Sequence, residues 1–381
     1  MGDNRRDSRA FYCFYCNFIY FYLGAGMKKY PIITKSRREH FGGIIFRESP
    51  AFVAYINHAS TDSYGIPHME GAILKEDVFT APLDAHLALT TRCNMYCKGC
   101  YSTLDGDAPA DIPLGLAKAI IDTLASLGLL SISFGGGEPT LHPHLQEIAA
   151  YAREKNVLPN MTTNGLNINP ENANDYAIFG TVHFSIHALK DMEHIFKAIR
   201  LYRKKTGKHP GLNLLLTTET LPELDNILTQ ARKAGIKKVL FLRYKITDKN
   251  KSIQGMEVDQ QLKNLPAILK SLSWRNRQMM FLIQCSLFEE LAENSTASIK
   301  TYTKNDLNGC QGGNAFIAID IHGNFKPCSF WHEAMGSVLE LNFDNWISNE
   351  KLNNFRKMRR DDGCHSCEFE ELCNGGCRLL Y

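Results

Sequence analysis

The sequence lacks any marked excess of one charge. Its 381 residues contain 43 lysines and arginines against 40 aspartates and glutamates, which gives a net charge of +3. Proteins that bind a phosphate backbone carry a clear basic surplus, and none is present here. We therefore expect no nucleic-acid partner.

Long apolar runs are also missing. The best candidate, FYCFYCNFIYFYLGAG, holds about 16 residues, whereas a helix needs roughly 20 to cross a bilayer. It follows two arginines, as in a signal sequence, and contains Cys13 and Cys16 as a CxxC pair. We interpret residues 1–26 as an unstructured leader or as the product of a start codon assigned too early, with Met27 opening the true protein. We expect no membrane partner.

Cysteine, in contrast, is abundant. There are 12 cysteines, and ten of them lie at or after Cys93 in closely spaced groups. A secreted disulfide scaffold would be shorter, whereas close spacings in a larger intracellular chain favour metal binding or catalysis. The sequence therefore indicates a metal-dependent, cytoplasmic protein.

From residue 84 onward, short apolar segments alternate with segments of helical period. Apolar residues in the latter recur at i, i+3, i+4 and i+7, which is typical of helices that cover buried parallel strands. We predict six strands, at residues 86–91, 129–134, 158–165, 181–187, 212–218 and 238–244. This α/β pattern predicts a partial (β/α)6 TIM-like barrel over residues 84–257.

The two flanking regions have different patterns. Residues 27–83 contain FGGIIF and AFVAYI on either side of Ser49-Pro50, which predicts a small accessory hairpin followed by a linker. Residues 258–381 begin with one more helical segment and then become rich in cysteine and turns, with a hairpin around AFIAIDIHGNFKPC. We expect this region to be a second, metal-dependent domain.

Cys93, Cys97 and Cys100 follow the first predicted strand, at the end where such barrels carry active-site groups. Three thiolates match neither a closed zinc site, which takes four ligands, nor a dithiol redox pair. A [4Fe-4S] cluster held by three thiolates keeps one iron open for a non-protein ligand. A partial zinc site and buried free thiols are the alternatives.

Other polar residues are predicted at the same rim. GGGEPT, residues 135–140, ends the second strand, where Gly135, Gly136 and Gly137 free the backbone for close approach to a ligand. Glu138 can then accept a hydrogen bond from a cationic amine. Polar residues that end later strands are Asn164, Ser185, His187 and Arg243.

The CxxxCxxC spacing of CNMYCKGC, the GGGEPT segment and the six-strand pattern together resemble the radical S-adenosylmethionine (SAM) superfamily. The resemblance implies that Cys93, Cys97 and Cys100 bind three irons and that the methionyl amine and carboxylate of SAM chelate the fourth. Cleavage of SAM then gives a 5′-deoxyadenosyl radical that abstracts hydrogen from the substrate. The protein supplies ligation, orientation and exclusion of water.

The resemblance also implies the residues that contact SAM. The segment of Gly136, Gly137 and Glu138 recognises the methionyl amine in the family, and polar residues at the fourth strand often contact the ribose. His187 stands where an acidic residue is expected, so it is either a ligand contact or a structural histidine. Gly99 replaces the aromatic residue that often precedes the third cysteine. The further cofactor contacts that we expect are Tyr101, Asn164, Ser185 and Arg243.

The carboxyl-terminal cysteines resemble six of the seven that mark the SPASM extension, which carries auxiliary iron-sulfur clusters. By position, the resemblance assigns Cys310, Cys328, Cys377 and, as a candidate fourth ligand, Cys285 to the first auxiliary cluster; it assigns Cys364, Cys367 and Cys373 to the second. Only RLLY follows Cys377, so we expect a truncated chain or a second cluster that lacks one cysteine. A zinc ribbon is the alternative.

The resemblance thus implies an enzyme that modifies a peptide or small-protein substrate and takes electrons from a reductant such as flavodoxin or ferredoxin. We expect the accessory hairpin to help hold a leader peptide by strand addition. Two other functions stay open: modification of a tetrapyrrole or heme side chain by the same chemistry, and a non-catalytic zinc-binding scaffold.

Overall fold

The computed structural model describes residues 31–102, 109–247, 250, 255–294, 308–359 and 362–380. The expected leader, with Cys13 and Cys16, and the proposed start at Met27 lie outside these residues. Within the described ranges, no helix combines the length and the apolar character that a membrane span requires.

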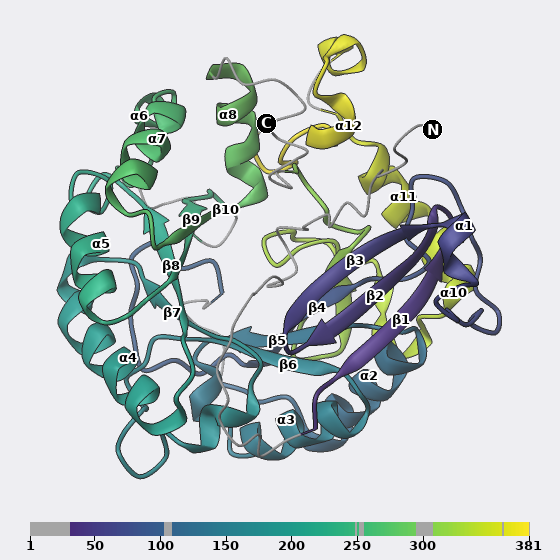
Figure 1. Cartoon of the computed structure of the whole chain (residues 1–381), viewed down its shortest axis with the longest axis horizontal. Helices are drawn as coiled ribbons and strands as arrows, with labels where there is room; N and C mark the ends of the chain where they lie inside the picture. The colour runs from purple at the N-terminus through teal and green to yellow at the C-terminus, as the bar shows by residue number, and fades with distance from the viewer. Residues whose placement is uncertain are drawn as a thin grey trace, which may run out of the picture.

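A ten-stranded sheet forms the centre of the structure (Figure 1). Its strand order is β10-β9-β8-β7-β6-β5-β4-β11-β12-β13. The six predicted strands are all present and pair in parallel: β4 (Asp84–Thr90), β5 (Ser131–Gly136), β6 (Leu158–Thr163), β7 (Val182–Ile186), β8 (Gly211–Leu216) and β9 (Lys238–Arg243). The predicted fold class, a partial TIM-like barrel, is confirmed.

Four helices cover the outer side of these strands (Figure 1). They are α2 (Leu114–Ser126), α3 (Leu145–Glu154), α4 (Met192–Thr206) and α5 (Leu224–Lys233). In α5, the buried residues are Leu224, Ile227, Leu228 and Ala231, which lie on one face at the spacing i, i+3, i+4 and i+7. The periodicity that predicts the helices therefore also identifies the faces that pack on the sheet.

The sheet continues past the predicted domain boundary at residue 257. On one side β10 (Met280–Ile283) pairs in parallel with β9, and on the other β11 (Phe316–Ile319) pairs in parallel with β4. The predicted hairpin is formed by β11 and β12 (Asn324–Lys326), and β13 (Gly336–Ser337) follows it in the sheet. The carboxyl-terminal region is thus joined to the barrel by backbone hydrogen bonds, which also cover the edges of β4 and β9.

The other helices lie outside this set of four. The predicted segment at 258–272 divides into α6 (Asp259–Leu262) and α7 (Leu265–Arg275), where a proline in the first turn of α7 suits a helix start. The remaining α-helices within the described ranges are α1 (His58–Thr61), α8 (Phe288–Asn294), α10 (Phe343–Ser348), α11 (Glu350–Lys357) and α12 (Glu370–Cys373). Single 3₁₀ turns span Pro139–Leu141, Asp175–Ile178, Leu189–Asp191, Cys285–Leu287, Val338–Glu340 and Asp362–Ser366.

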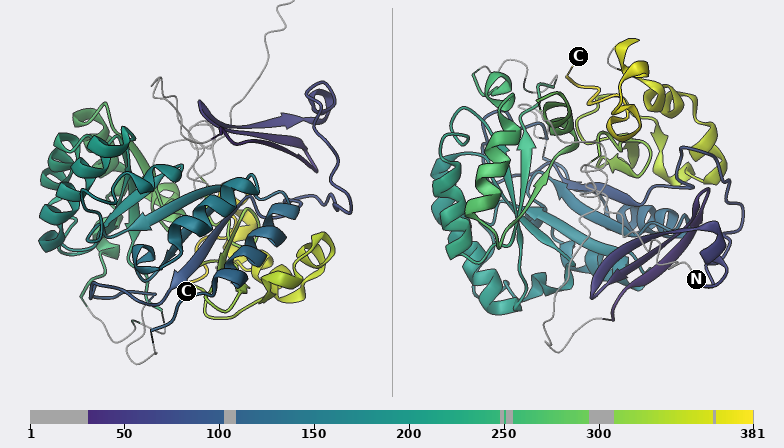
Figure 2. Two further views of the ribbon diagram at one scale, coloured as in Figure 1. Left: turned by 90° about the horizontal axis from the view of Figure 1, so that it is seen from below. Right: turned by 45° about the horizontal axis from the view of Figure 1, so that its top comes forward.

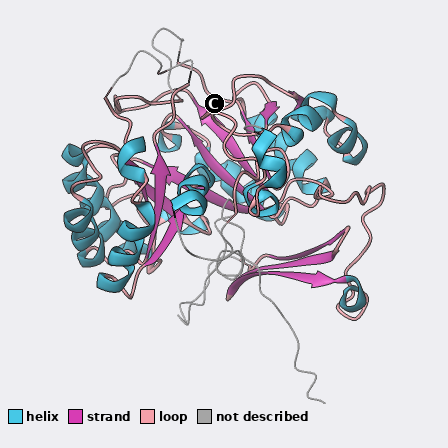
Figure 3. Cartoon of the chain, turned by 90° about the horizontal axis from the view of Figure 1, so that it is seen from above, coloured by secondary structure: helices cyan, strands magenta, loops and turns pink. Residues whose placement is uncertain are grey.

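The amino-terminal region forms a separate three-stranded antiparallel sheet beside the main one (Figures 2 and 3). The predicted hairpin is β2 (Gly42–Glu48) with β3 (Ala51–Asn57), and β1 (Thr34–Glu39) adds a third strand that the sequence analysis missed. The sequence of β1, TKSRRE, has no apolar alternation because its inward-facing positions hold Arg37 and Glu39.

The small sheet covers the amino ends of the barrel strands. Its apolar side chains, among them Ile44 and Phe46, form a cluster with Leu83, Leu130 and Leu158, which lie immediately before or at the starts of β4, β5 and β6. The cysteine loop follows the other end of β4, and that strand of 7 residues spans roughly 23 Å. A peptide added to the small sheet would therefore lie at the face opposite the cysteine loop.

Arg37 fixes the small sheet to the barrel. Its side chain is fully buried, pairs with Glu39 Oε1 at 2.7 Å and donates to the carbonyl oxygens of Ala81, Pro82 and Leu127. Glu39 Oε2 in turn accepts from the backbone N–H and hydroxyl of Thr80. The buried charges are thus fully engaged, and removal of one would leave the other without compensation.

We expect Arg37→Met to lower the free energy of unfolding by about 3–5 kcal/mol, because it leaves Glu39 as an uncompensated buried charge. Urea unfolding, followed together with limited proteolysis of residues 31–80, would measure this. Arg275→Met is the matched control: Arg275 and Asp225 form an exposed pair, with 45% and 60% of their side chains accessible, and its loss should cost less than about 1 kcal/mol. Equal losses in both variants would contradict the role of Arg37.

Candidate active site

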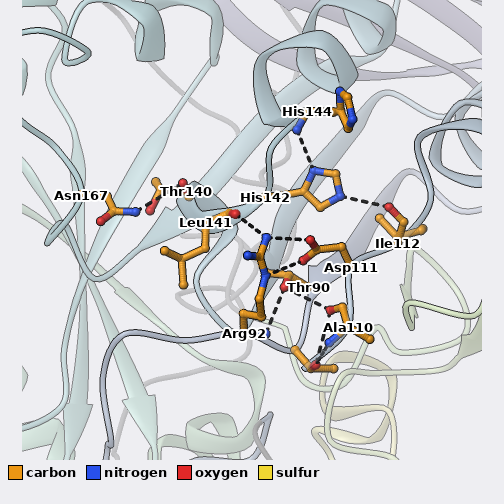
Figure 4. Close-up of polar contacts among 11 residues, drawn as sticks. Thr90, Arg92, Ala110, Asp111, Ile112, Thr140, Leu141, His142, His144 and Asn167 are labelled. Carbon is orange, nitrogen blue, oxygen red and sulfur yellow. Dashed lines mark hydrogen bonds and ion pairs between the residues drawn. The ribbon is translucent and has the colours of Figure 1, made fainter. Parts of the chain in front are cut away.

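Arg92, immediately before Cys93, holds the base of the cysteine loop (Figure 4). Its guanidinium makes two bonds to Asp111, at 2.9 and 2.6 Å, and donates to Leu141 O at 2.6 Å. Figure 4 shows these contacts joining three segments: the end of β4, the residues before α2 and the turn after β5. The bidentate geometry fixes the direction in which the chain leaves β4.

The glycines of GGGEPT pack against this base. Gly137 N donates to Thr90 O at 2.7 Å, and Glu138 N donates to Arg92 O at 2.8 Å. A Cβ atom on Gly137 would clash with the Arg92 carbonyl, and one on Gly136, at φ 108°, would clash with Thr90 O. The sequence analysis attributed these glycines to approach of a ligand, but the space that they leave is filled by the cysteine-loop backbone. Both glycines nevertheless line the adjacent cavity.

Cys93, Cys97 and Cys100 are free, half-buried thiols that line a cavity of about 250 Å³ at the carboxyl ends of the strands. Cys100 N donates to Cys97 O at 3.2 Å, which closes a tight turn between these two residues. Gly99, within that turn, has φ 72°, and a Cβ there would lie 2.5 Å from the Tyr244 ring. The position therefore requires glycine, because a tyrosine from the end of β9 already fills the space.

The environment of the triad disfavours three free thiolates. Burial, together with the charges of Cys100, Asp191 and Cys93, raises the pKa of Cys97 to about 12. Burial also raises the pKa of Cys93, with contributions from Glu138 and Cys100. A bound cationic metal group would remove this cost. Among the described residues, no three His, Cys, Asp or Glu side chains are placed to hold one metal ion, whereas a cubane cluster distributes its thiolates over different irons.

Glu138 is 1% exposed and lines the same cavity. Its Oε1 accepts bonds from the N–H and hydroxyl of Thr140 and from Thr163 Oγ1, and its Oε2 accepts from Asn164 N at 2.7 Å. Burial raises the pKa of Glu138 despite these donors. Because a carboxylate oxygen can accept two bonds, Oε2 keeps capacity for a donor in the cavity.

The polar residues predicted on β6 and β7 also line the cavity. Asn164 Nδ2 donates to Asn94 Oδ1 at 2.7 Å, which ties the end of β6 to the cysteine loop, and Ser185 is 7% exposed. His187 Nδ1 lies 3.3 Å from Cys97 Sγ. Burial lowers the pKa of His187, although Asp191 opposes this change, so the neutral ring contacts a triad sulfur directly.

Arg243 has a different position. Its guanidinium pairs with Asp259 at 2.6 Å and Glu290 at 3.2 Å and donates to Ser286 O, and it is not among the residues that line the cavity. The prediction that Arg243 contacts SAM is therefore corrected. Its charge is used to join the end of β9 to α6 and α8.

Tyr101 lies between two groups of cysteines. Burial raises its pKa, as do the charges of Cys100 on one side and Cys328 on the other. Its ring contacts that of Phe330, with centroids 4.3 Å apart and planes at 34°. Since Phe330 follows Cys328 by two positions, this aromatic pair connects the cysteine loop to the carboxyl-terminal region.

The first auxiliary group consists of the four thiols that the sequence analysis assigned together, Cys285, Cys310, Cys328 and Cys377. The Cys285 thiol donates to the Cys310 sulfur, which raises the pKa of Cys285 and lowers that of Cys310. Burial raises the pKa of Cys328 to about 12, and the charges of Cys310 and Cys377 act in the same direction. The fold thus brings together thiols that are up to 92 residues apart, between positions 285 and 377.

The second auxiliary group consists of Cys364, Cys367 and Cys373. Burial raises the pKa of Cys373 to about 12, with further contributions from Glu289, Cys364 and Cys367. Cys310 N donates to Cys373 O at 3.3 Å, and Cys377 N donates to Glu289 Oε1 at 2.8 Å. The two auxiliary groups are therefore held next to each other by the backbone hydrogen bond between Cys310 and Cys373, with the Glu289 carboxylate near both.

A larger cavity, of about 550 Å³, adjoins the first. The residues that line both are His86, Tyr101, Ser102, Gly136, Ser329 and Phe330. His86 projects from the middle of β4, where burial lowers its pKa to about 4, and its Nδ1 lies 2.7 Å from Ser329 Oγ. The outer wall carries His322, Lys326 and His332.

Several of these residues were missed in the sequence analysis. Arg92 could have been recognised from the sequence, since it directly precedes the first cysteine of the triad. His86 could have been found from strand alternation, which places it on the inner face of β4. Phe330 gave no signal in the sequence, because its proximity to the cysteine loop depends on how distant segments meet.

Comparison with known proteins agrees with this arrangement. The profile of the radical SAM superfamily matches residues 87–248, and the profile of an iron-sulfur cluster-binding domain, SPASM, matches residues 310–368. The first range contains the triad, and the second contains Cys310, Cys328, Cys364 and Cys367.

Curated relatives share about a quarter of their residues with this chain. A mycofactocin maturase, MftC, of Mycobacterium tuberculosis is 26% identical and covers 78% of either chain. A PqqA peptide cyclase of Bradyrhizobium diazoefficiens is 26% identical over 79% of this chain and 83% of its own length. An Fe-coproporphyrin III synthase of Methanosarcina barkeri is 24% identical over 76% of this chain and 82% of its own length.

The fold is also similar to that of solved structures. SuiB of Streptococcus suis, in complex with the precursor peptide SuiA, superposes with a TM-score of 0.72 at 16% identity and covers 91% of this chain and 94% of its own. With both profiles matched, the barrel formed and the cysteines gathered at its rim, the chain belongs to the radical SAM superfamily and carries a SPASM iron-sulfur cluster-binding domain.

Proposed function

We propose that this enzyme modifies a side chain of a peptide or small protein. The main supporting observation is that the cavity lined by the triad adjoins the cavity of about 550 Å³, so that a substrate segment could extend from one into the other. The PqqA relative is named as a peptide cyclase, and SuiB was solved with a precursor peptide. We place the enzyme in the cytoplasm, with a flavodoxin or ferredoxin as its reductant.

The residues proposed to hold the SAM-binding [4Fe-4S] cluster are Cys93, Cys97 and Cys100. Their donor set and half-buried position at the cavity wall suit a cluster with one iron open to SAM. When bound, the reduced cluster and SAM supply a 5′-deoxyadenosyl radical that abstracts hydrogen from the substrate. The chain contributes a fixed cysteine loop, hydrogen-bonding groups around the cavity and exclusion of water.

Auxiliary clusters are proposed at the two further thiol groups. Cys285, Cys310, Cys328 and Cys377 provide four thiols for one cluster, and Cys364, Cys367 and Cys373 contribute to the other. Cys328 lines the same cavity as Cys93, Cys97 and Cys100, which supports a first auxiliary cluster beside the cysteine loop. A SPASM cluster in this position could relay electrons to or from the substrate cavity.

Replacement of Cys93, Cys97 and Cys100 together with alanine should abolish reductive SAM cleavage. We expect the anaerobically reconstituted wild type to contain about eight to twelve irons and the triple variant to lose about four of them, because the auxiliary thiols are untouched. Chromatography of 5′-deoxyadenosine and iron analysis would measure both changes. Retained 5′-deoxyadenosine production, or stoichiometric zinc without iron in the wild type, would contradict the assignment.

Glu138→Ala should weaken SAM binding by about 10- to 100-fold while the iron content is kept, since charged hydrogen bonds contribute roughly 1.5–3 kcal/mol. Equilibrium dialysis with the reconstituted protein would measure the affinity. Glu147→Ala is the control, because Glu147 lies exposed on α3 and pairs with Lys118 at the surface. Loss of iron together with SAM affinity would instead indicate that Glu138 supports the cysteine loop.

A tetrapyrrole substrate is the second candidate. The Fe-coproporphyrin III synthase relative motivates it, and Lys326, His322 and His332 on the outer cavity wall would suit the carboxylates of a porphyrin.

The substrate class can be tested by incubating the reduced enzyme and SAM with each candidate. A candidate precursor peptide should acquire a mass change under anaerobic turnover, whereas Fe-coproporphyrin III should be unchanged. Mass spectrometry distinguishes the two outcomes. A modified porphyrin with an unmodified peptide would overturn the peptide proposal in favour of the second candidate.

A further inference from the structure

Lys245 is a buried cation that neither the sequence motifs nor the matched profiles explain. It follows β9 by two positions and is 4% exposed. A lysine ammonium without compensation is costly in such a place, so its neighbours must offset the loss of water. The groups around Lys245 therefore indicate the role of its charge.

Two contacts hold the side chain and its backbone. The ammonium lies 4.1 Å from the centroid of the Phe330 ring, which is a favourable cation–π geometry. Asn250 Nδ2 donates both to Lys245 O, at 3.0 Å, and to Gly99 O, at 2.9 Å. Lys245 is thus fixed between the triad loop and the segment that carries Cys328.

The Phe330 ring that Lys245 contacts lies two positions after Cys328, and the charges that act most strongly on Lys245 are those of the first auxiliary group. Burial by itself would lower the pKa of Lys245, but the charges of Cys377, Cys285, Cys328 and Cys310 raise it. Arg378 is a second buried cation near Cys310, yet Lys245 interacts with all four thiols. These four thiols exert the largest charge effects on its pKa.

A fixed positive charge changes the redox behaviour of an iron-sulfur cluster. Reduction makes the cluster more negative, and a nearby cation stabilises the reduced form more than the oxidised form. Net charge and local environment are among the properties by which a protein sets cluster potentials.

We propose that Lys245 is a positioning residue for electron transfer, whose buried ammonium raises the reduction potential of the cluster held by Cys285, Cys310, Cys328 and Cys377. This inference rests on the proposed function, since it requires a cluster at the first auxiliary group. The Tyr101–Phe330 contact joins the segments that carry Cys100 and Cys328. The difference in reduction potential between the two clusters sets the direction of electron flow between them.

A potentiometric titration followed by electron paramagnetic resonance tests the proposal on the reconstituted full chain. At the midpoint potential of the wild type, Lys245→Met should raise the oxidised-to-reduced ratio of the first auxiliary cluster about tenfold. This ratio corresponds to a midpoint potential that is lower by about 59 mV for a one-electron change. Lys245→Arg should restore the wild-type midpoint. The second auxiliary cluster should not shift and serves as an internal reference.

Lys238→Met is the matched control variant. Lys238 begins β9, is also 4% exposed and lies at the opposite end of that strand from Lys245. Its replacement should leave the midpoint potential of the first auxiliary cluster unchanged. A shift in Lys238→Met would show that the effect comes from general loosening of the fold, and it would overturn the proposal.

Lys245→Gln provides a second neutral side chain in case Lys245→Met does not retain iron. Full iron content with an unchanged midpoint in either neutral variant would overturn the proposal, as would loss of the first auxiliary irons in both. Absence of iron at this group in the wild type would instead refute the auxiliary cluster itself. The two failures are therefore distinguishable.

Discussion

The parallel pairing of β11 with β4 is the constraint on which the arrangement of the site depends. β4 leads into the loop of Cys93, Cys97 and Cys100, while β11 lies between Cys310 and Cys328 in the chain. Because the two strands are neighbours in one sheet, the thiols after β4 and those around β11 lie on adjacent segments. The contact between Tyr101 and Phe330 follows from this pairing.

Backbone contacts at the end of β4 give the site its rigidity. The glycines of GGGEPT have no side chains where the Thr90 and Arg92 carbonyls approach, and Arg92 itself is held by Asp111. Rigid support of this kind matters because a cofactor site works only if its ligands are held close to their productive geometry. The loop therefore depends in part on Arg92 and Asp111, which are not among the residues that line the triad cavity.

Charge is distributed unevenly around the cavities. Burial raises the pKa of Cys93, Cys97 and Glu138 and lowers that of His86, so it disfavours the charged form of each of these groups. Lys245 is the exception, because the thiols of the first auxiliary group keep it charged. The net charge of +3 for the whole chain gives no indication of this contrast between buried groups.

The sequence by itself determined the class of the fold and the identity of the cysteines. Helical and strand periods are local properties, and the spacing of CNMYCKGC places its thiols on one short loop wherever that loop lies. Only the tertiary structure decided what surrounds them. It made β1 a strand through the buried pair of Arg37 and Glu39, and it turned Arg243 toward Asp259 and away from the cavity. It brought Lys245 to thiols more than 30 residues away because long-range sheet pairing sets such contacts, and periodicity in the sequence carries no record of which strands meet.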